Sequence, residues 1–144
     1  MTKTKEITVS TRPSFNFDQI DQRTKQVTPA LITAVVEQIV QYWQPAQVIL
    51  FGSQVNQKAT SESDLDLLVV LDDFHPLAQL TPRARFGKLL ELFPYRSFGL
   101  DAIVLTNSEI QKLQKTNEGE WDLVLEILAE GKVLYGHPQK AQAE

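Results

Sequence analysis

The segment Asp64-Leu65-Asp66 leads directly into five apolar residues, Leu67 to Leu71. An apolar run this short, with polar residues on both sides, is typical of a strand whose two faces are both buried. Successive side chains of a strand point to opposite faces, so Asp64 and Asp66 should project to the same side. The sequence therefore predicts a central strand of a covered sheet, with two carboxylates side by side at its start.

Three other segments have the composition of short strands. The first, Val48 to Phe51, runs into Gly52-Ser53. The second, Leu100 to Leu105, carries Asp101 near its start. A final strand is predicted over Lys132 to Tyr135. All of these segments are too short for helices and are separated by polar or helical stretches, as expected for the strands of one small sheet.

Helices are predicted between these strands from their start and stop signals. Thr28-Pro29 and Thr81-Pro82 each supply a capping hydroxyl followed by a proline in the first helical position. The apolar residues after them recur at helical spacing and continue to Pro45 and Pro94 respectively. Two more helical patterns complete the set, at 108–115 and 120–130, and the second ends at a glycine.

This alternation predicts an α+β fold (α/β mixed), in which a small mixed sheet is flanked by helices. Residues 1–27 are polar and irregular and are predicted to form a flexible N-terminal segment. A single folded domain is predicted over 28–136, followed by a loose C-terminal tail at 137–144. The length of 144 residues suits one domain with a substantial core.

Composition narrows the function classes. The chain has a net charge of −4 and a pI of about 5.2, which argues against a broad grip on DNA or RNA. It has no cysteine, which excludes disulfides and thiolate metal sites. The N-terminal residues lack the apolar core of a signal peptide, and no stretch approaches the length of a membrane span. We therefore expect a cytoplasmic protein that binds neither membranes nor nucleic-acid polymers.

The carboxylates suggest metal chemistry. Two carboxylates about 4 Å apart repel by roughly 4 kcal/mol at an effective dielectric constant of 20, so Asp64 and Asp66 need a counter-charge. If the sheet brings Asp101 beside them, the three could hold two Mg²⁺ ions, which prefer carboxylate oxygens. Gly52 would let the backbone approach a phosphate, and the Ser53 hydroxyl could donate a hydrogen bond to it. Each feature alone is typical of a turn or a solvated strand end, and their combination favours nucleotidyl transfer.

The motifs carry a family resemblance. Phe51-Gly52-Ser53 and the run from Ser63 to Val69 resemble the signature of the DNA polymerase β-like nucleotidyltransferase superfamily, and specifically its minimal nucleotidyltransferases. The segment Leu100 to Val104 is similar to the strand that carries the third carboxylate of that superfamily. The resemblance covers about Thr28 to Tyr135. It implies catalysis and metal binding by Asp64, Asp66 and Asp101 and nucleotide binding by Gly52 and Ser53.

Proteins similar to this one are antitoxins that pair with a HEPN-type ribonuclease toxin. The resemblance therefore implies Mg²⁺-dependent AMP transfer from ATP to a tyrosine of such a toxin. Alternatives stay open: an inactive or weakly active antitoxin that only binds, a nucleotide sensor, or an enzyme that modifies a small molecule such as an aminoglycoside. The sequence leaves homo- and hetero-oligomeric assemblies equally open.

The chain departs from the antitoxin pattern at Gln54 and Asn56, where arginines usually follow the Gly-Ser pair. An arginine there would neutralise triphosphate charge. The cations that could replace it are Lys58, Arg83, Arg85 and Arg96, each of which also fits an ordinary solvated surface position.

The remaining conspicuous residues favour structural roles. His75 and His137 stand alone, each next to a proline, and are predicted to lie at the surface. Trp43 and Trp121 fall on the apolar faces of predicted helices and are expected in the core. Asp72-Asp73 ends the second strand roughly 20 Å from the paired aspartates, and is predicted to be a solvated turn.

Overall fold

The computed structural model describes residues 27–56, 64–116 and 122–136, which form one mixed α+β domain. Its elements follow the order α1 (Pro29–Trp43), β1 (Gln47–Phe51), α2 (Ser53–Asn56), β2 (Leu65–Leu71), η2 (Pro76–Gln79), α3 (Pro82–Leu90), β3 (Leu100–Thr106), α4 (Asn107–Thr116), α5 (Asp122–Glu130) and β4 (Lys132–Gly136). The predictions for residues 1–26 and 137–144, and for Trp121, fall outside the described residues.

The four described strands form a sheet in the order β3-β2-β1-β4. β1 is antiparallel to both β2 and β4, whereas β2 and β3 are parallel. A parallel pair needs a crossover connection, and here η2 and α3 supply it. The sheet is therefore mixed, which confirms the fold class predicted from the sequence.

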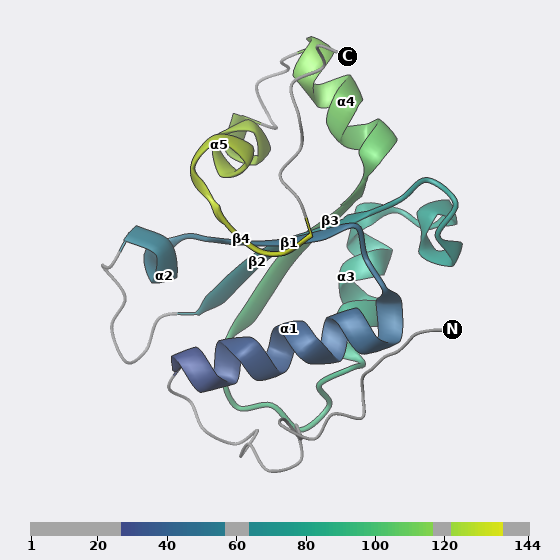
Figure 1. The fold of residues 1–144 in the computed structure, drawn as a ribbon. Helices are drawn as coiled ribbons and strands as arrows, with labels where there is room; N and C mark the ends of the chain where they lie inside the picture. Colours follow the sequence, from purple (N-terminus) through teal and green to yellow (C-terminus); the bar gives the residue numbers. More distant parts are fainter. Residues whose placement is uncertain (1–26, 57–63, 117–121, 137–144) are drawn as a thin grey trace.

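Helices cover both faces of the sheet. In Figure 1, where the sheet is seen nearly edge-on, α1 and α3 lie on one side and α4 and α5 on the other. β2 is central and buried on both faces: Leu65, Leu67, Val69 and Leu71 pack in the cluster that contains α1 and α3. Leu68 and Val70 pack in the cluster that contains α4 and α5. The alternation places the side chain of Asp66 on the face covered by α4 and α5.

Short-range signals set the helix starts. The Thr28 hydroxyl accepts the N–H of Leu31 at 3.1 Å, and the Thr81 hydroxyl accepts that of Ala84 at 3.1 Å, as the two Thr-Pro pairs predict. Helix α4 begins with a capping box. The Glu109 carboxylate accepts the N–H of Thr106 at 2.9 Å, while the Thr106 hydroxyl accepts the N–H of Glu109 at 3.2 Å.

Three local predictions need correction. β2 begins at Leu65, so Asp64 lies just before the strand and not within it. Helix α3 ends at Leu90 and gives way to turns before Pro94. The connection after β2 contains the short 3₁₀-helix η2, which the sequence analysis treated as a simple break.

His75 is also more than a surface residue, because it is partly buried and joins two elements. Its Nδ1 accepts the N–H of Leu77 at 3.0 Å, and its Nε2 lies 2.7 Å from the carbonyl oxygen of Trp43. Since Nδ1 accepts, the proton of the neutral ring is on Nε2, which donates to Trp43. The histidine therefore caps η2 and ties it to the end of α1. Trp43 lies in the core, as predicted.

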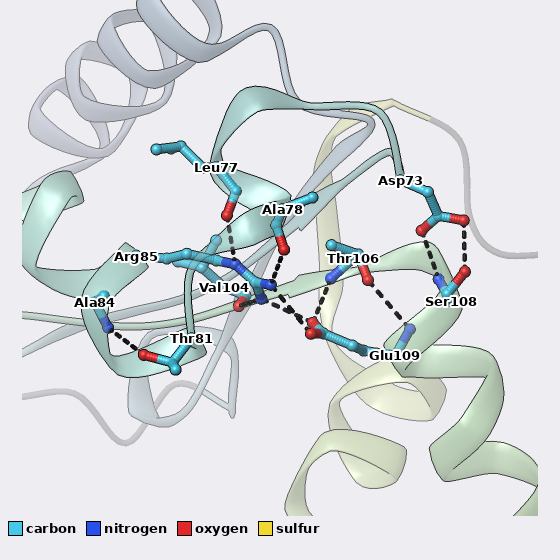
Figure 2. A network of polar contacts seen from close by, with 10 residues as sticks. All are labelled: Asp73, Leu77, Ala78, Thr81, Ala84, Arg85, Val104, Thr106, Ser108 and Glu109. Carbon is cyan, nitrogen blue, oxygen red and sulfur yellow. Dashed lines mark hydrogen bonds and ion pairs between the residues drawn. The ribbon is translucent and has the colours of Figure 1, made fainter.

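A polar network at the same end of the sheet centres on Arg85 of α3, which is 1% exposed (Figure 2). The guanidinium makes a bidentate pair with Glu109, at 2.7 Å from Nη1 and 3.0 Å from Nη2. It also donates to the carbonyl oxygens of Leu77, Ala78 and Val104 at 2.9 to 3.1 Å. All five N–H groups of the guanidinium thus have acceptors, and the network joins η2, α3, β3 and α4.

Candidate active site

The parallel pairing of β2 and β3 sets Asp66 directly opposite Asp101. Neighbouring strands lie about 4.8 Å apart, and opposed residues of a parallel pair project to the same face of the sheet. Both carboxylates therefore emerge on the side covered by α4 and α5, at the end of the sheet where β2 and β3 begin. Asp66 is half-buried and Asp101 is exposed. The structure thus brings together two of the three predicted ligands.

Asp64 joins them from the segment just before β2. The N–H of Leu65 donates to the carbonyl oxygen of Gly99 at 2.9 Å, which holds this segment against the start of β3. Gly99 is needed at this point, because a Cβ there would collide with the Asp64 carboxylate. The three aspartates consequently gather at one end of the sheet, as the sequence predicts.

The electrostatics of Asp66 reflect this proximity. Burial, followed by the negative charges of Asp101 and Asp64, raises its pKa from 3.8 to about 6. A carboxylate that remains protonated up to nearly neutral pH lacks a compensating cation. The site therefore favours any ligand that brings positive charge to these oxygens.

The turn after β1 lies against the same carboxylates. Gly52 has a φ of +81°, which favours glycine, and a Cβ at this position would collide with the Asp66 carboxylate. Ser53 is the first residue of the single-turn helix α2. The Gly-Ser turn and the aspartates are thus parts of one site. Position 52 requires glycine because its backbone lies so close to the Asp66 carboxylate.

Gln54 gives the turn a second link to the carboxylates. Its side-chain Nε2 donates to the backbone carbonyl oxygen of Asp64 at 3.3 Å. At this position, where the sequence analysis expected an arginine in related antitoxins, the glutamine joins α2 to the segment that carries Asp64. The role of Gln54 in the structure is therefore to connect the two halves of the site.

The chemistry of the donor set fits a hard divalent cation such as Mg²⁺, because all three side chains supply carboxylate oxygens. The pKa of Asp66 is raised by burial and by the negative charges of Asp101 and Asp64, and a cation would offset these charges. Among the described residues, no three metal-ligating side chains already converge on a common point. Asp64, Asp66 and Asp101 would have to adjust their side-chain torsions to hold an ion.

The structure excludes one of the four cations that could replace the missing arginine. Arg85 is buried in the network at the opposite end of the sheet, so the suggestion that it binds triphosphate is wrong. Arg83 is exposed on α3, and Arg96 donates to the carbonyl oxygen of Phe93 at 3.1 Å. Lys58 lies outside the described residues.

A cavity of about 270 Å³ adjoins the site between Gly52 and α5. Its walls include Phe51 and Val55 on one side and Leu123, Glu126, Ile127 and Glu130 of α5 on the other. The sequence analysis assigned α5 to the core and overlooked this face. The signal was present in the spacing of these four residues, at positions i, i+3, i+4 and i+7 of one helix stripe.

The chain is similar to a known family and to a solved structure. A solved structure of a presumed nucleotidyltransferase from Sulfolobus solfataricus aligns with a TM-score of 0.48 and 16% identity, over 78% of this chain and 84% of its own. Comparison with curated proteins gives no match. Within the described part of the chain, none of the helices combines the length and apolar character needed to cross a bilayer. The family model of the nucleotidyltransferase domain matches residues 32–135, which include β1 to β4 and the whole site, so the chain belongs to the nucleotidyltransferase domain family.

Proposed function

We propose that this nucleotidyltransferase transfers AMP from ATP to a hydroxyl group of a protein acceptor, and that Mg²⁺ supports the reaction. The observation that carries the proposal is the register of β2 and β3, which sets Asp66 opposite Asp101 beside the Gly52 turn. Three carboxylates gathered next to a glycine turn suit a metal-bound triphosphate, because their negative charges call for a cation.

Each residue has a distinct task in this proposal. The backbone at Gly52 and the Ser53 hydroxyl bind and orient phosphate oxygens. Asp64 and Asp66 would hold the cation, which supplies counter-charge for the triphosphate. Asp101 is exposed, and its Oδ1 accepts the N–H of Ala102 at 2.9 Å. It would accept the proton of the incoming hydroxyl.

The reaction balances without any further reactant. The acceptor oxygen loses its proton to Asp101 and forms a bond to the α-phosphorus of ATP. The bond between that phosphorus and the bridging oxygen breaks, and pyrophosphate leaves with its electron pair. The products are the adenylylated acceptor and pyrophosphate.

The proposed acceptor is a tyrosine of a HEPN-type ribonuclease toxin, so the chain would act as an antitoxin. The support for this partner is the resemblance of the Gly-Ser and Asp-x-Asp motifs to those of minimal nucleotidyltransferases. A second candidate is an antitoxin that neutralises its partner by binding alone. The observation that favours it is Gln54, which stands where an arginine would bind triphosphate and instead bonds to the Asp64 backbone.

Labelling with [α-³²P]ATP tests the proposal. The full chain is incubated with Mg²⁺ and the small all-helical protein, carrying an Arg-x₄-His motif, that a neighbouring reading frame is expected to encode. We expect label on the partner and release of pyrophosphate. Asp66→Asn should reduce transfer by about 10³-fold, since it removes several kcal/mol of charge stabilisation.

The matched control is Glu37→Gln, which removes an exposed carboxylate from α1 and should leave transfer unchanged. A tight complex that forms without any label would support the antitoxin that only binds. Calorimetry adds an assay without partner: we expect heat on titration with MgATP, and its loss in Asp66→Asn. Absence of both label and heat would contradict the proposed function.

A further inference from the structure

The cavity beside Gly52 has one wall that the reaction outlined above does not use. Helix α5 presents Leu123, Glu126, Ile127 and Glu130 to it. Leu123 is 50% exposed although it is a large apolar side chain, and both glutamates are exposed. Two carboxylates one helical turn apart with apolar neighbours do not contribute to the core and lack a described ion-pair partner. This wall is therefore available to a ligand.

The charge of this wall indicates which kind of ligand the cavity favours. Two glutamates repel a triphosphate, and the aspartates next to the cavity add further negative charge. The cavity consequently disfavours phosphate groups. It favours a cationic group carried on an apolar stem, which could contact Phe51, Leu123 and Ile127 with its carbon atoms and the glutamates with its charge.

The position of the cavity links it to the reacting groups. Gly52 lines the cavity and also lies against the Asp66 carboxylate. A group bound in the cavity is therefore only one residue of the turn away from the carboxylates. It would enter from the same side of the sheet, because the cavity and the aspartates both lie on the face covered by α5.

The size of the cavity restricts the ligand further. Its volume of about 270 Å³ is below the range of about 300 to 1,000 Å³ that is usual for small-molecule sites. A single long side chain fits such a space better than a multi-ring compound. Of the two sources of a cationic group, a protein side chain and a free polyamine, the apolar lining and the volume favour the side chain.

We propose that this cavity binds a lysine or arginine side chain of the protein acceptor, close to the hydroxyl that receives AMP. The identification of the ligand as part of the acceptor rests on the proposed function, whereas the binding of a basic side chain does not. Glu126 and Glu130 are then specificity-determining residues for the acceptor.

Binding of short peptides tests this proposal without nucleotide or partner. The probes are acetyl-Gly-Arg-Gly-Tyr-Gly-amide and the same peptide with citrulline, which has nearly the shape of arginine but no charge. We expect the arginine peptide to shift the amide resonances of Gly52, Val55 and α5 in ¹H–¹⁵N spectra of the full chain. The citrulline peptide should bind about tenfold more weakly, as for the loss of two partly exposed ion pairs.

Variants separate this cavity from the neighbouring aspartates. The double variant Glu126→Gln/Glu130→Gln should lose the preference for arginine over citrulline, while Glu37→Gln should retain it. Charge reversal, Glu126→Lys/Glu130→Lys, should instead favour the peptide with glutamate in place of arginine. All of these positions are exposed, and unchanged spectra outside α5 would show that each variant is folded.

Several outcomes would overturn the proposal. One is equal affinity for the arginine and citrulline peptides, and another is an arginine preference that survives in the double variant. A third is binding of spermidine at these amides with no binding of the peptide, which would assign the cavity to a free polyamine. A chain that discriminates the peptides but never transfers AMP would refute the proposed function and leave the basic-side-chain site standing.

Discussion

Carboxylates at the two ends of the paired strands β2 and β3 have pKa values shifted in opposite directions. Where the strands begin, Asp64, Asp66 and Asp101 gather, and the pKa of Asp66 is raised to about 6 by burial and by the other two carboxylates. Beyond the other ends, Glu109 overcomes its own burial through hydrogen bonds from Arg85 and Thr106, and its pKa is lowered. Asp73 accepts bonds from Ser108 there, and its pKa is lowered too.

This contrast separates the carboxylates that hold the fold from those that we propose to bind ligands. Figure 2 shows that the carboxylates of Glu109 and Asp73, which hold the fold, each accept hydrogen bonds from several donors. Burying charged groups in this way is tolerated only when the partners are complete. Among the described residues, the carboxylates at the other end accept fewer hydrogen bonds, one of them from the N–H of Ala102 to Asp101, and we propose that they bind cations instead.

The largest expected effect is loss of stability on removing Arg85. Arg85→Ala deletes five hydrogen bonds and leaves Glu109 and three carbonyl oxygens without their donor, so we expect a cost of about 3–5 kcal/mol in urea unfolding. Arg83→Ala, an exposed neighbour on the same helix, should change stability by less than about 0.5 kcal/mol. Similar losses of stability in Arg85→Ala and Arg83→Ala would mean that the Arg85 network does not hold the fold.

The second prediction concerns the glycine at the site. Gly52→Ala places a Cβ in a left-handed backbone conformation and against the Asp66 carboxylate. We expect a loss of about 2 kcal/mol in stability, from the backbone conformation and the displaced side chain. Because the carboxylate must move, MgATP binding measured by calorimetry should weaken as well. Unchanged binding would show that Gly52 is required by the turn alone.

The sequence predicted the elements better than it predicted their long-range contacts. The two Thr-Pro pairs located the starts of α1 and α3, since a capping bond depends on residues three apart. The strands were found within about a residue, because short and largely apolar segments between polar ones leave few other structures. Strand order and direction depend on how distant segments pack, and no local pattern states them.

Arg85 and Glu109 illustrate the same limit. In sequence Arg85 has the appearance of a solvated helix residue, and its burial depends on carbonyl oxygens from β3 and η2. The capping box at Thr106 was readable, although the sequence analysis began that helix at Ser108. Strand alternation is a local feature and predicted that Asp64 and Asp66 lie together, whereas the position of Asp101 beside them depends on the parallel pairing of β2 and β3.

A third prediction uses pH to measure how much the ionised Asp66 carboxylate destabilises the folded chain. Its folded pKa of about 6 lies above the value of 3.8 for a free aspartate, so the ionised form disfavours folding above pH 6. The penalty fades as the pH falls from 6 toward 4. Asp66→Asn should therefore be more stable than the parent at pH 8, by on the order of 1 kcal/mol after allowing for solvent screening, and equal to it near pH 4.

Mg²⁺ should reduce this destabilisation by bringing positive charge to the ionised Asp66. We expect 10 mM Mg²⁺ to raise the melting temperature of the parent chain at pH 8, and much less at pH 5, where the carboxylate is protonated. Asp66→Asn should show neither the shift nor its pH dependence. A parent and variant with identical pH profiles would mean that Asp66 is not the site of the unbalanced charge.

The smallest expected effect comes from a glycine that has no such neighbour. Gly87 lies in α3 on an exposed face, and a Cβ there would meet nothing within 4 Å. Gly87→Ala should therefore stabilise the chain by up to about 1 kcal/mol, because alanine loses less backbone freedom in a helix. MgATP binding should be unchanged, in contrast to Gly52→Ala. The opposite signs expected for the same substitution at Gly52 and Gly87 would show that the left-handed turn and the nearby Asp66 carboxylate require glycine at Gly52, whereas no neighbouring atom requires it at Gly87. If Gly87→Ala were destabilising, the space beside that residue would have to be occupied in solution, and the face of α3 that carries it would itself be an interaction surface.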